Sequence, residues 1–597
     1  MNKKTKIILL LITLTAFFIR IYKTNSYPPL LWDETAIGYN AYSILKTGKD
    51  EYGEFLPLIF KSFGDYKPGF YIYLTVPFVA IFGLNPLSVR LPSIILGSLT
   101  PLFLYLLITQ INPKNKKTRN LALISALILA FNPYNIHYSR GAWETNILTF
   151  QLILASYFFF KAITSENAVT RRGNIKKNNY FLLSSLAFSL SLYTYQSAKM
   201  ISLFLIFILF SINLKTNVNA VTRRGKIQKN KNKFLKHFIL PLFLLSLPII
   251  YGLLFSSDTN RLKVLSLFSY PRSQQETETI ISEGNKLDYQ IFYNQPIFFL
   301  RNFLNRYFNH FSPKFLIFQG DWQNPRHSAP YIGVILYPSI IFLLIGIFHS
   351  LSFSTLSIFF LFWLLIAPIP ASLTRDSIQA TRTMSLSIPI VFFISLGLNS
   401  FLSFIHKSYF INLPAGRHGH KSIFFTFYFL LITVYFFSFF YYSDLYLNHM
   451  TKKSPQDFLY GYEESIQYLI KNQNKYDNIY FTDFYNQPYI YYLFYSKYPP
   501  LKYQQQAFLT KNQVGDTGKI EKLDNIIFHA PDFQFIKSQQ NTLVIYSHQE
   551  IIRLGIDKST DFSKLIQLSP INNISTFYAY QTSVIPTEVE GSHNLPK

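Results

Sequence analysis

Long apolar runs separated by short basic loops occupy about the first 440 positions of this 597-residue chain. Runs of this length are typical of helices that cross a bilayer. We expect eleven such spans, at about residues 7–22, 89–111, 121–138, 145–163, 180–196, 199–213, 237–254, 331–349, 355–370, 384–404 and 423–442. The pattern therefore predicts an α-helical polytopic membrane protein.

Two apolar segments need a separate interpretation. The first run follows a lysine-rich start, as a signal peptide would, but no small-residue cleavage motif follows it, so we expect an uncleaved helix. The segment 70–83, "FYIYLTVPFVAIFG", is also apolar. We expect it to lie at the membrane interface or to re-enter from outside, because one extra span would place every later basic loop outside.

The composition becomes polar after about residue 443. A helical pattern covers 455–473, and strand-like runs follow at 478–484, 525–530 and 541–547. We therefore predict two domains, a transmembrane domain over 1–442 and a small extracytoplasmic α/β domain over 443–597. The many tyrosines of the second domain fit either a core or sugar stacking.

Lysine and arginine are distributed unevenly between alternate loops. With a cytoplasmic N-terminus, the segments predicted inside hold 22 basic residues and one acid, Glu166, whereas the first outer loop holds four basic residues and six acids. This bias predicts a plasma-membrane protein with a cytoplasmic N-terminus and an extracytoplasmic second domain. It also accounts for much of the net charge of +26, so no nucleic-acid partner is expected.

The chain contains no cysteine, which excludes disulfides and cysteine-ligated metals. The heptapeptide "NAVTRRG" occurs at 167–173 and again at 219–225. It fits either a docking patch for anionic lipid or a partner, or a short insertion tolerated in two exposed loops, and we favour the insertion. The stretches 413–422 and 585–597 resemble appended, structureless sequence.

Ionisable residues gather at the predicted outer ends of the spans. The stretch "PPLLWDETAIGYNAYSILKTG", 28–48, places adjacent carboxylates beside a tryptophan directly after the first span. Charged groups at a membrane are costly unless they are paired or solvated, so this gathering predicts a functional site. A single arginine could instead anchor the interface, and a tryptophan could belong to an aromatic belt. The residues concerned are Trp32, Asp33, Glu34, Asp65, Lys67, Arg90, Arg140, Glu144, Tyr195, Arg326, His327 and Arg382.

Carboxylates together with lysine and arginine suit the transfer of a sugar from a polyprenyl-phosphate carrier. The phosphate leaves as an anion and needs a cation to stabilise it. The acceptor hydroxyl must lose a proton as it attacks, and a carboxylate can take that proton. A transporter or flippase for lipid-linked sugars, or a non-catalytic envelope assembly protein, is the alternative. A transporter should show polar residues at mid-span or broken helices in both halves, whereas these spans are mostly apolar.

The motifs "WDE" (32–34), "KP" (67–68), "RLPS" (90–93) and "HYSRGAWE" (137–144) resemble the GT-C superfamily of integral-membrane glycosyltransferases. The similarity is to the bacterial protein O-mannosyltransferase and aminoarabinose transferase branch, although this chain reads "KPG" where aminoarabinose transferases have a double proline. The resemblance implies that Asp33 is the general base, that Lys67 lies near the carrier phosphate and that Glu144 is a second acid.

We accordingly predict three groups of site residues. Asp33, Glu34 and Glu144 are the catalytic candidates, with Glu34 orienting the acceptor or assisting a divalent cation, the one candidate cofactor. The donor phosphate should contact Lys67, Arg140 and Arg382. Substrate contacts should come from Trp32, Asp65, Tyr195, Arg326 and His327, and candidate metal ligands are Glu34, Asp65 and Glu144. The expected partners are a polyprenyl-phosphate sugar, an acceptor that is a protein, lipid or glycan, and the bilayer.

Overall fold

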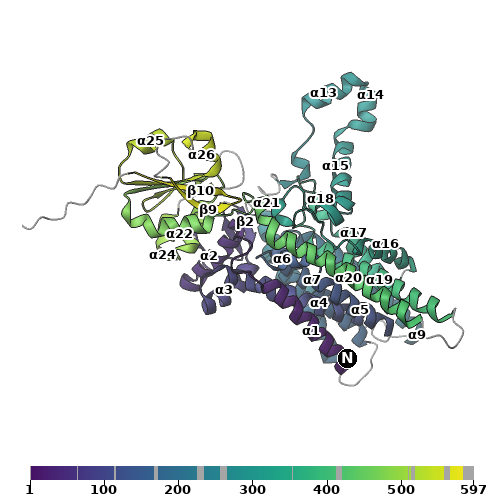
Figure 1. Ribbon diagram of the computed structural model, residues 1–597. Coiled ribbons are helices and arrows are strands. Elements are labelled where there is room, and N and C mark those ends of the chain that lie inside the picture. Colours follow the sequence, from purple (N-terminus) through teal and green to yellow (C-terminus); the bar gives the residue numbers. More distant parts are fainter. Residues whose placement is uncertain are drawn as a thin grey trace, which may run out of the picture.

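The computed structural model describes most of the chain. The described residues are 2–63, 65–112, 116–166, 173–224, 234–255, 265–352, 354–411, 420–507, 510–511, 518–556 and 565–582. A helical bundle forms one part of the molecule and a sheet domain caps the bundle at the end opposite the N-terminus (Figure 1).

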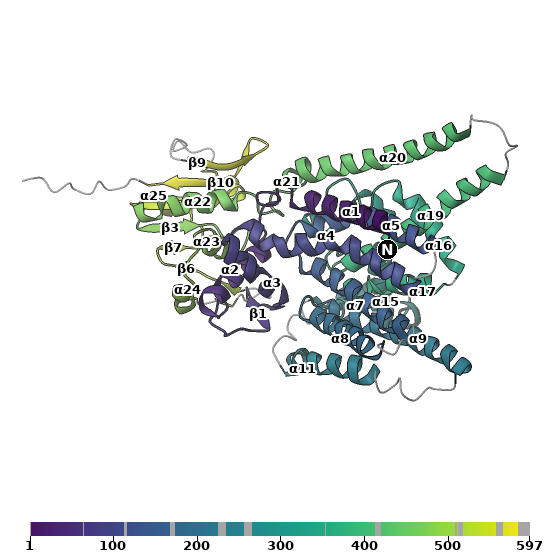
Figure 2. The same ribbon diagram turned by 90° about the horizontal axis from the view of Figure 1, so that it is seen from below.

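Each of the eleven apolar runs overlaps a helix. The helices of the bundle are α1 (Lys3–Ile21), α4 (Pro86–Ile111), α5 (Lys116–Ala130), α6 (Pro133–Ser139), α7 (Glu144–Glu166), α8 (Gly173–Leu192), α9 (Ala198–Arg224), η1 (Leu235–Ile239), α11 (Leu240–Phe255), α16 (Ser339–His349), η6 (Ser350–Ser352), α17 (Thr355–Ile366), α18 (Ile369–Ser372), η7 (Met384–Leu386), α19 (Ser387–Ile411) and α20 (His420–Asp444). In two views, α1, α4 and α20 lie along about the same axis (Figures 1 and 2).

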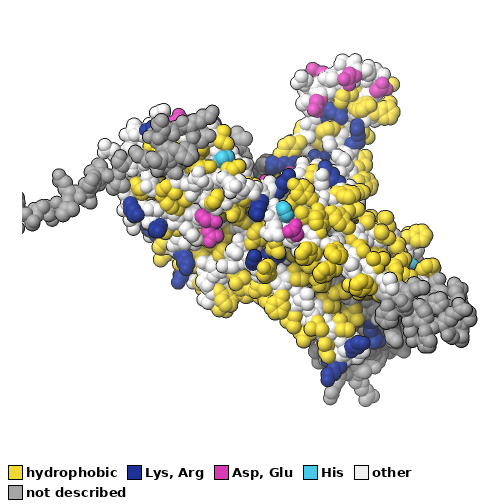
Figure 3. Space-filling view, viewed as in Figure 1, with side chains coloured by type: hydrophobic (Ala, Val, Ile, Leu, Met, Phe, Trp, Pro, Cys, Tyr) yellow, Lys and Arg dark blue, Asp and Glu magenta, His cyan; other side chains and the backbone are white. Residues whose placement is uncertain are grey.

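Six described helices are long and apolar enough to cross a membrane, or seven if the pair α5–α6, bent by 56°, forms one span. Three further predicted spans coincide with shorter apolar helices at Asn179–Leu192, Ala198–Leu214 and Ser339–His349. The chain is a multi-pass membrane protein, and the count of eleven stays a prediction. Hydrophobic side chains cover much of the bundle surface in view, while lysine and arginine gather toward its ends (Figure 3).

The run predicted at 331–349 becomes helical later than expected. Its first part is irregular backbone that hydrogen-bonds to the 315–317 segment, with Gly333 N donating to Ile317 O at 2.7 Å. Helix α16 then begins at Ser339, directly after Pro338. Farther along, the backbones of α16 and α19 are in close contact at Gly346. A Cβ at that position would lie 1.8 Å from Phe393 O. Small residues allow such close contact between membrane helices.

The first outer loop folds into α2 (Trp32–Thr47), a hairpin of β1 (Ile59–Ser62) and β2 (Asp65–Pro68), and α3 (Phe70–Phe82). Helix α2 is buried over most of its length between α4 and the sheet domain. A Cβ on Gly38 would lie 2.5 Å from Phe494 of that domain and 2.7 Å from Val89 of α4. Tyr39 donates to Tyr498 O at 3.0 Å. The loop is therefore clamped between the two parts of the molecule.

The C-terminal part is a sheet domain with helices on it, as the sequence predicted. Its six-stranded mixed sheet has the order β6-β7-β3-β8-β10-β9, in which β3 runs parallel to β7 and β8. The strands are β3 (Asn478–Phe481), β6 (Lys522–Leu523), β7 (Ile526–Ile527), β8 (Thr542–Ser547), β9 (Leu565–Ile571) and β10 (Ile574–Gln581), with β4 (Thr510–Lys511) and β5 (Gly518–Lys519) as a separate pair. The helices are η8 (Leu445–His449), α21 (Met450–Lys453), α22 (Tyr462–Asn472), η9 (Gln473–Lys475), α23 (Pro488–Tyr495), α24 (Pro500–Gln506), α25 (Phe533–Ser538) and α26 (His548–Leu554).

Two features of this domain differ from the prediction. The helix expected over 455–473 begins only at Tyr462, because Gly461 adopts φ 100°, a left-handed conformation outside the helical range. The β9–β10 hairpin was not predicted. Its turn residues Asn572 and Asn573 both have positive φ, which matches the type of two-residue turn that asparagine favours.

A helical arm projects sideways from the bundle (Figure 1). It consists of η2 (Leu267–Ser269), α13 (Gln274–Glu283), α14 (Lys286–Asp288), η3 (Tyr289–Tyr293) and α15 (Gln295–Asn309). The chain returns to the bundle through η4 (Lys314–Phe318) and η5 (Pro325–His327).

Candidate functional site

Asp33, Lys67 and Glu144 line one narrow pocket. Asp33 comes from the first turn of α2, Lys67 from β2, and Glu144 is the first residue of α7. Asn40 and Tyr71 also line the pocket. Three residues predicted from separate stretches of the sequence are thus brought together at the end of the bundle that the sheet domain covers.

Lys67 and Asp33 form an ion pair in which Lys67 Nζ donates to Asp33 Oδ1. The two side chains are 21% and 36% exposed, so solvent reaches both. Lys67 Nζ also lies 5.5 Å from the centre of the Phe63 ring. The β1–β2 hairpin sets this position, because it places Lys67 opposite Phe60 and turns the lysine toward the start of α2. A carboxylate in the first turn of a helix is itself favoured by the helix dipole.

Glu34 is buried, and both of its carboxylate oxygens accept hydrogen bonds. Arg90 donates from Nε to Glu34 Oε1 at 2.8 Å and from Nη2 to Oε2 at 2.7 Å. The backbone N–H of Ala142 donates to Oε1 at 2.8 Å, and that of Leu31 donates to Oε2 at 3.1 Å. The prediction that Glu34 orients the acceptor or holds a metal ion does not fit this geometry, because both carboxylate oxygens already accept strong hydrogen bonds.

Arg140 lies away from the pocket, buried against the end of α1. It donates from Nη1 to Ile19 O at 2.8 Å and from Nη2 to Tyr27 O at 3.4 Å, and it sits 5.2 Å from the Tyr446 ring centre. The last carbonyls of a helix have no partner within the helix, and Arg140 satisfies one of them. This role does not fit the predicted contact with a donor phosphate.

Arg382 is also paired outside the described lining of the pocket. Its Nη1 donates to Thr374 Oγ1 at 2.7 Å and lies 3.4 Å from Asp376 Oδ2. The Arg382 side chain is 16% exposed. A role for Arg382 at the donor phosphate remains a prediction.

Trp32, Arg326 and His327 form a second group beside the pocket. The Arg326 guanidinium lies 5.4 Å from the Trp32 ring centre, a cation–π contact. His327 Nδ1 lies 3.0 Å from Asp321 Oδ2, which also accepts from Ala380 N at 2.8 Å. Asp321 was not among the predicted site residues, although it precedes His327 by six positions in the polar stretch "GDWQNPRH", 320–327.

The Asp321–His327 pair is buried and carries one charge. Burial lowers the pKa of His327, which favours the neutral imidazole. Burial alone would raise the pKa of Asp321, but the hydrogen bonds from His327, Ala380 and Asn324 outweigh it and lower that pKa. The carboxylate is therefore ionised and accepts the Nδ1–H of a neutral His327, which leaves Nε2 as an acceptor.

The remaining predicted positions are less informative. Tyr195 is half-buried in the turn between α8 and α9, against the bundle core. Asp65 begins β2, but its side chain lies outside the described residues, as do the side chains of both NAVTRRG copies and the stretches 413–422 and 585–597. Within the part of the chain that is described, no three acidic or histidine side chains gather as a metal site would require. The divalent cation therefore stays a prediction.

A family model matches the first part of the chain, and a solved structure resembles nearly all of it. Residues 10–258 match the family model "Dolichyl-phosphate-mannose-protein mannosyltransferase". Among solved structures, the chain resembles ArnT from Cupriavidus metallidurans bound to undecaprenyl phosphate, with 12% identity and a TM-score of 0.50 over 97% of this chain and 98% of that chain. A comparison with curated proteins found no match.

Two other solved structures are similar over smaller parts. Oligosaccharyltransferase AglB from Archaeoglobus fulgidus, in complex with an inhibitory peptide and a dolichol-phosphate, is 12% identical, with a TM-score of 0.46 over 83% of this chain and 64% of that chain. The protein O-mannosyltransferase Pmt1-Pmt2 complex from S. cerevisiae, bound to the sugar donor, is 16% identical, with a TM-score of 0.34 over 45% of this chain and 36% of that chain.

Proposed function

Because the chain has the GT-C fold of membrane glycosyltransferases, we propose that it transfers a sugar from a polyprenyl-phosphate carrier to an acceptor on the extracytoplasmic side of the membrane. The observation that carries this proposal is the shared pocket of Asp33, Lys67 and Glu144. It supplies a carboxylate base and a cation side by side, which are the two groups that the reaction needs.

In the proposed reaction, Asp33 takes the proton of the acceptor hydroxyl. The acceptor oxygen bonds to the anomeric carbon as the bond from that carbon to the phosphate oxygen breaks, and the phosphate keeps the bonding electron pair. Lys67 stabilises the charge that grows on the phosphate. In the structure Lys67 is paired with Asp33, so a donor phosphate that draws Lys67 toward itself would leave Asp33 as a stronger base.

Glu144 and Glu34 have different proposed roles. Glu144 lines the pocket with Asp33 and Lys67 and is placed to stabilise the positive charge that develops on the sugar ring. Glu34 holds the start of α2 against α4 and the 141–142 turn through Arg90 and Ala142 N. It is a positioning residue that fixes where Asp33 lies.

The test is transfer by the purified full-length protein in detergent. Radiolabelled polyprenyl-phosphate sugars are incubated with extracted lipid, protein and glycan fractions, and we expect label to move into one of them. Asp33→Asn should lower the rate about 10²–10⁴-fold, the usual range for a lost general base, while Asp532→Asn, at an exposed position of the sheet domain, should not.

Two outcomes would contradict the proposal. An Asp33→Asn protein with normal transfer would remove Asp33 from the reaction. A wild-type protein that transfers nothing, but moves the intact donor between the leaflets of a vesicle, would identify a transporter. A loss smaller than tenfold would point to an acceptor that is already ionised, such as a phosphate, which needs no base.

A further inference from the structure

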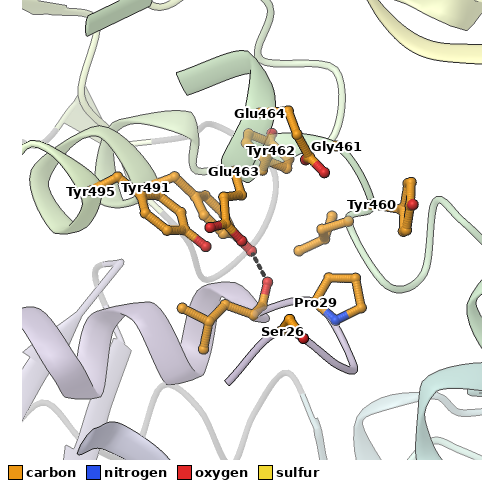
Figure 4. Close-up of a pocket in the computed structure, with 11 residues that line it drawn as sticks. Ser26, Pro29, Tyr460, Gly461, Tyr462, Glu463, Glu464, Tyr491 and Tyr495 are labelled. Carbon is orange, nitrogen blue, oxygen red and sulfur yellow. Dashed lines mark hydrogen bonds between the residues drawn. The ribbon is translucent and has the colours of Figure 1, made fainter. Parts of the chain in front are cut away.

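A second pocket lies where the first outer loop meets the sheet domain. Pro29 of the first loop forms one side of it, and Glu463 of α22 with Tyr491 and Tyr495 of α23 form the other (Figure 4). Tyr460 closes a third side. No residue of this pocket belongs to the predicted site, and the pocket of Asp33 has a separate lining.

Two buried tyrosine rings, Tyr462 and Tyr491, support the wall of this second pocket. The rings of Tyr462 and Tyr491 stack with centres 4.3 Å apart and planes 14° from parallel. The Tyr491 hydroxyl donates to Leu30 O at 2.9 Å, and the Tyr462 hydroxyl donates to Asn486 O at 3.0 Å. A wall supported in this way loses little conformational freedom when a ligand binds.

The polar groups of the pocket are hydroxyls and carboxyls. Its described lining includes Ser26, Tyr460, Glu463 and Glu464 but no lysine, arginine or histidine. Burial, followed by the neighbouring charge of Glu464, raises the pKa of Glu463. A carboxyl whose charged form is disfavoured is better suited to hydrogen-bond a neutral hydroxyl than to hold a cation.

The pocket has room for a small polar ligand. Its volume is about 90 Å³, several times the roughly 10–15 Å³ that a cavity needs to admit one water molecule. It continues into a groove of about 860 Å³ that shares Ser26, Pro29 and Tyr460 with it. Asn572 and Asn573 of the β9–β10 turn contribute neutral hydrogen-bonding side chains to the groove, and Lys23 and Lys452 add two cations to its lining.

We propose that this tyrosine–carboxyl pocket binds one sugar ring of a glycan, and that the groove holds the units that follow. We further propose that this glycan is the acceptor, an assignment that rests on the proposed function. Leu30, in the pocket lining, and Asp33 are three residues apart, so at most about 11 Å of chain separates them. The pocket wall at Leu30 therefore lies within that distance of the backbone that carries the proposed base.

Binding is tested without any transfer. The full-length protein in detergent is titrated with mannobiose, cellobiose and chitobiose, and contact is read as saturation transfer from protein to sugar protons. We expect at least one disaccharide to bind. Because an amide replaces one carboxyl oxygen by a nitrogen that cannot accept, Glu463→Gln should weaken that binding about tenfold, the equivalent of one hydrogen bond, and Tyr460→Ala should have a similar effect by removing a side of the pocket. Glu521→Gln, at an exposed position of the same domain, should leave it unchanged.

Absence of binding by all three sugars, or binding that Glu463→Gln and Tyr460→Ala both leave intact, would overturn the pocket proposal. Preferential binding of a lysine-rich peptide would also overturn it and would assign the pocket to a basic protein segment. Correct folding of each variant is checked by its apparent unfolding temperature, and the Tyr460→Ala variant serves if Glu463→Gln does not fold.

The role in transfer is tested separately. Glu463→Gln should raise the KM for a glycan acceptor about tenfold with little change in the KM for the donor. If the wild-type protein binds sugars but transfers none, the proposed function fails and the pocket stands. If transfer proceeds and the acceptor KM is unchanged in Glu463→Gln, the pocket is not an acceptor subsite.

Discussion

Replacing Glu51 by glutamine should make the protein more stable at neutral and alkaline pH. Glu51 lies in the first outer loop with no exposed surface. Its backbone N–H donates to Asn40 Oδ1 at 3.0 Å, and Asn40 Nδ2 donates to Glu51 Oε1 at 3.0 Å. Its other carboxyl oxygen, Oε2, is buried and has no hydrogen-bond partner among the described residues. Burial raises the pKa of Glu51 to about 8.

The magnitude follows from proton linkage. Below pH 4.5, the ordinary value, the folded and unfolded states both hold the proton. Between pH 4.5 and about 8 the folded state keeps the proton that the unfolded state loses, so stability falls as pH rises. At about 1.4 kcal/mol per pH unit, the loss is about 3 kcal/mol at pH 7 and about 5 kcal/mol above pH 8. Glutamine cannot ionise and should remove this loss.

The assay is the apparent unfolding temperature of the purified protein in detergent between pH 5 and pH 8.5. Wild type and Glu51→Gln should agree near pH 5 and diverge steadily above it, with the variant more stable. Asp50, whose pKa burial also raises, stays in both proteins and cancels from the difference. Glu54→Gln, an exposed position in the same loop, is the matched control and should follow wild type.

Parallel pH profiles for wild type and Glu51→Gln would refute the reasoning. A variant that is less stable than wild type at every pH would mean that Glu51 is ionised in the folded protein and paired with a nearby lysine.

Three further predictions concern the pocket and its frame. Lys67→Ala should lower turnover by the equivalent of about 2–4 kcal/mol of transition-state stabilisation while weakening carrier binding less, and unchanged kinetics would exclude Lys67 from the site. Glu34→Gln should destabilise the protein by about 3–5 kcal/mol, because it leaves the buried Arg90 charge uncompensated, and Glu34→Gln with Arg90→Met should recover part of that loss in the unfolding temperature. A reporter fused at Ser443 should give an extracytoplasmic signal, and a cytoplasmic signal would overturn the predicted span count.

The sequence predicted most helices because lipid imposes a strong constraint. A backbone that crosses a bilayer must satisfy its own hydrogen bonds, so each long apolar run could be predicted as a helix by itself. The grouping of Asp33, Lys67 and Glu144 was predictable for a similar reason. Charged residues at span ends on one face of the membrane are costly unless they pair with one another or are solvated in a cavity. The β9–β10 hairpin was less visible because Pro570 interrupts its first strand.

The roles of individual charged residues were harder to predict. Asp33 and Glu34 are neighbours in the sequence, and only the fold shows that one faces the pocket while the other faces Arg90, 56 positions away. Arg140 looked like a phosphate ligand because it stands beside Glu144 in an outer turn. Its partners are carbonyls about 120 positions earlier, which no local pattern indicates.

The clamped first loop has a consequence for how the protein is made. Tyr39 in α2 bonds to Tyr498, 459 positions later in the chain. At roughly 5–20 residues per second, the ribosome needs about 20–90 s to synthesise what lies between them. During that time α2 lacks the side chains of the sheet domain, such as Phe494, that cover it in the folded protein. A product that ends before α23 would therefore carry the residues of the reaction pocket but leave the face of α2 that Phe494 and Tyr498 cover without its partner.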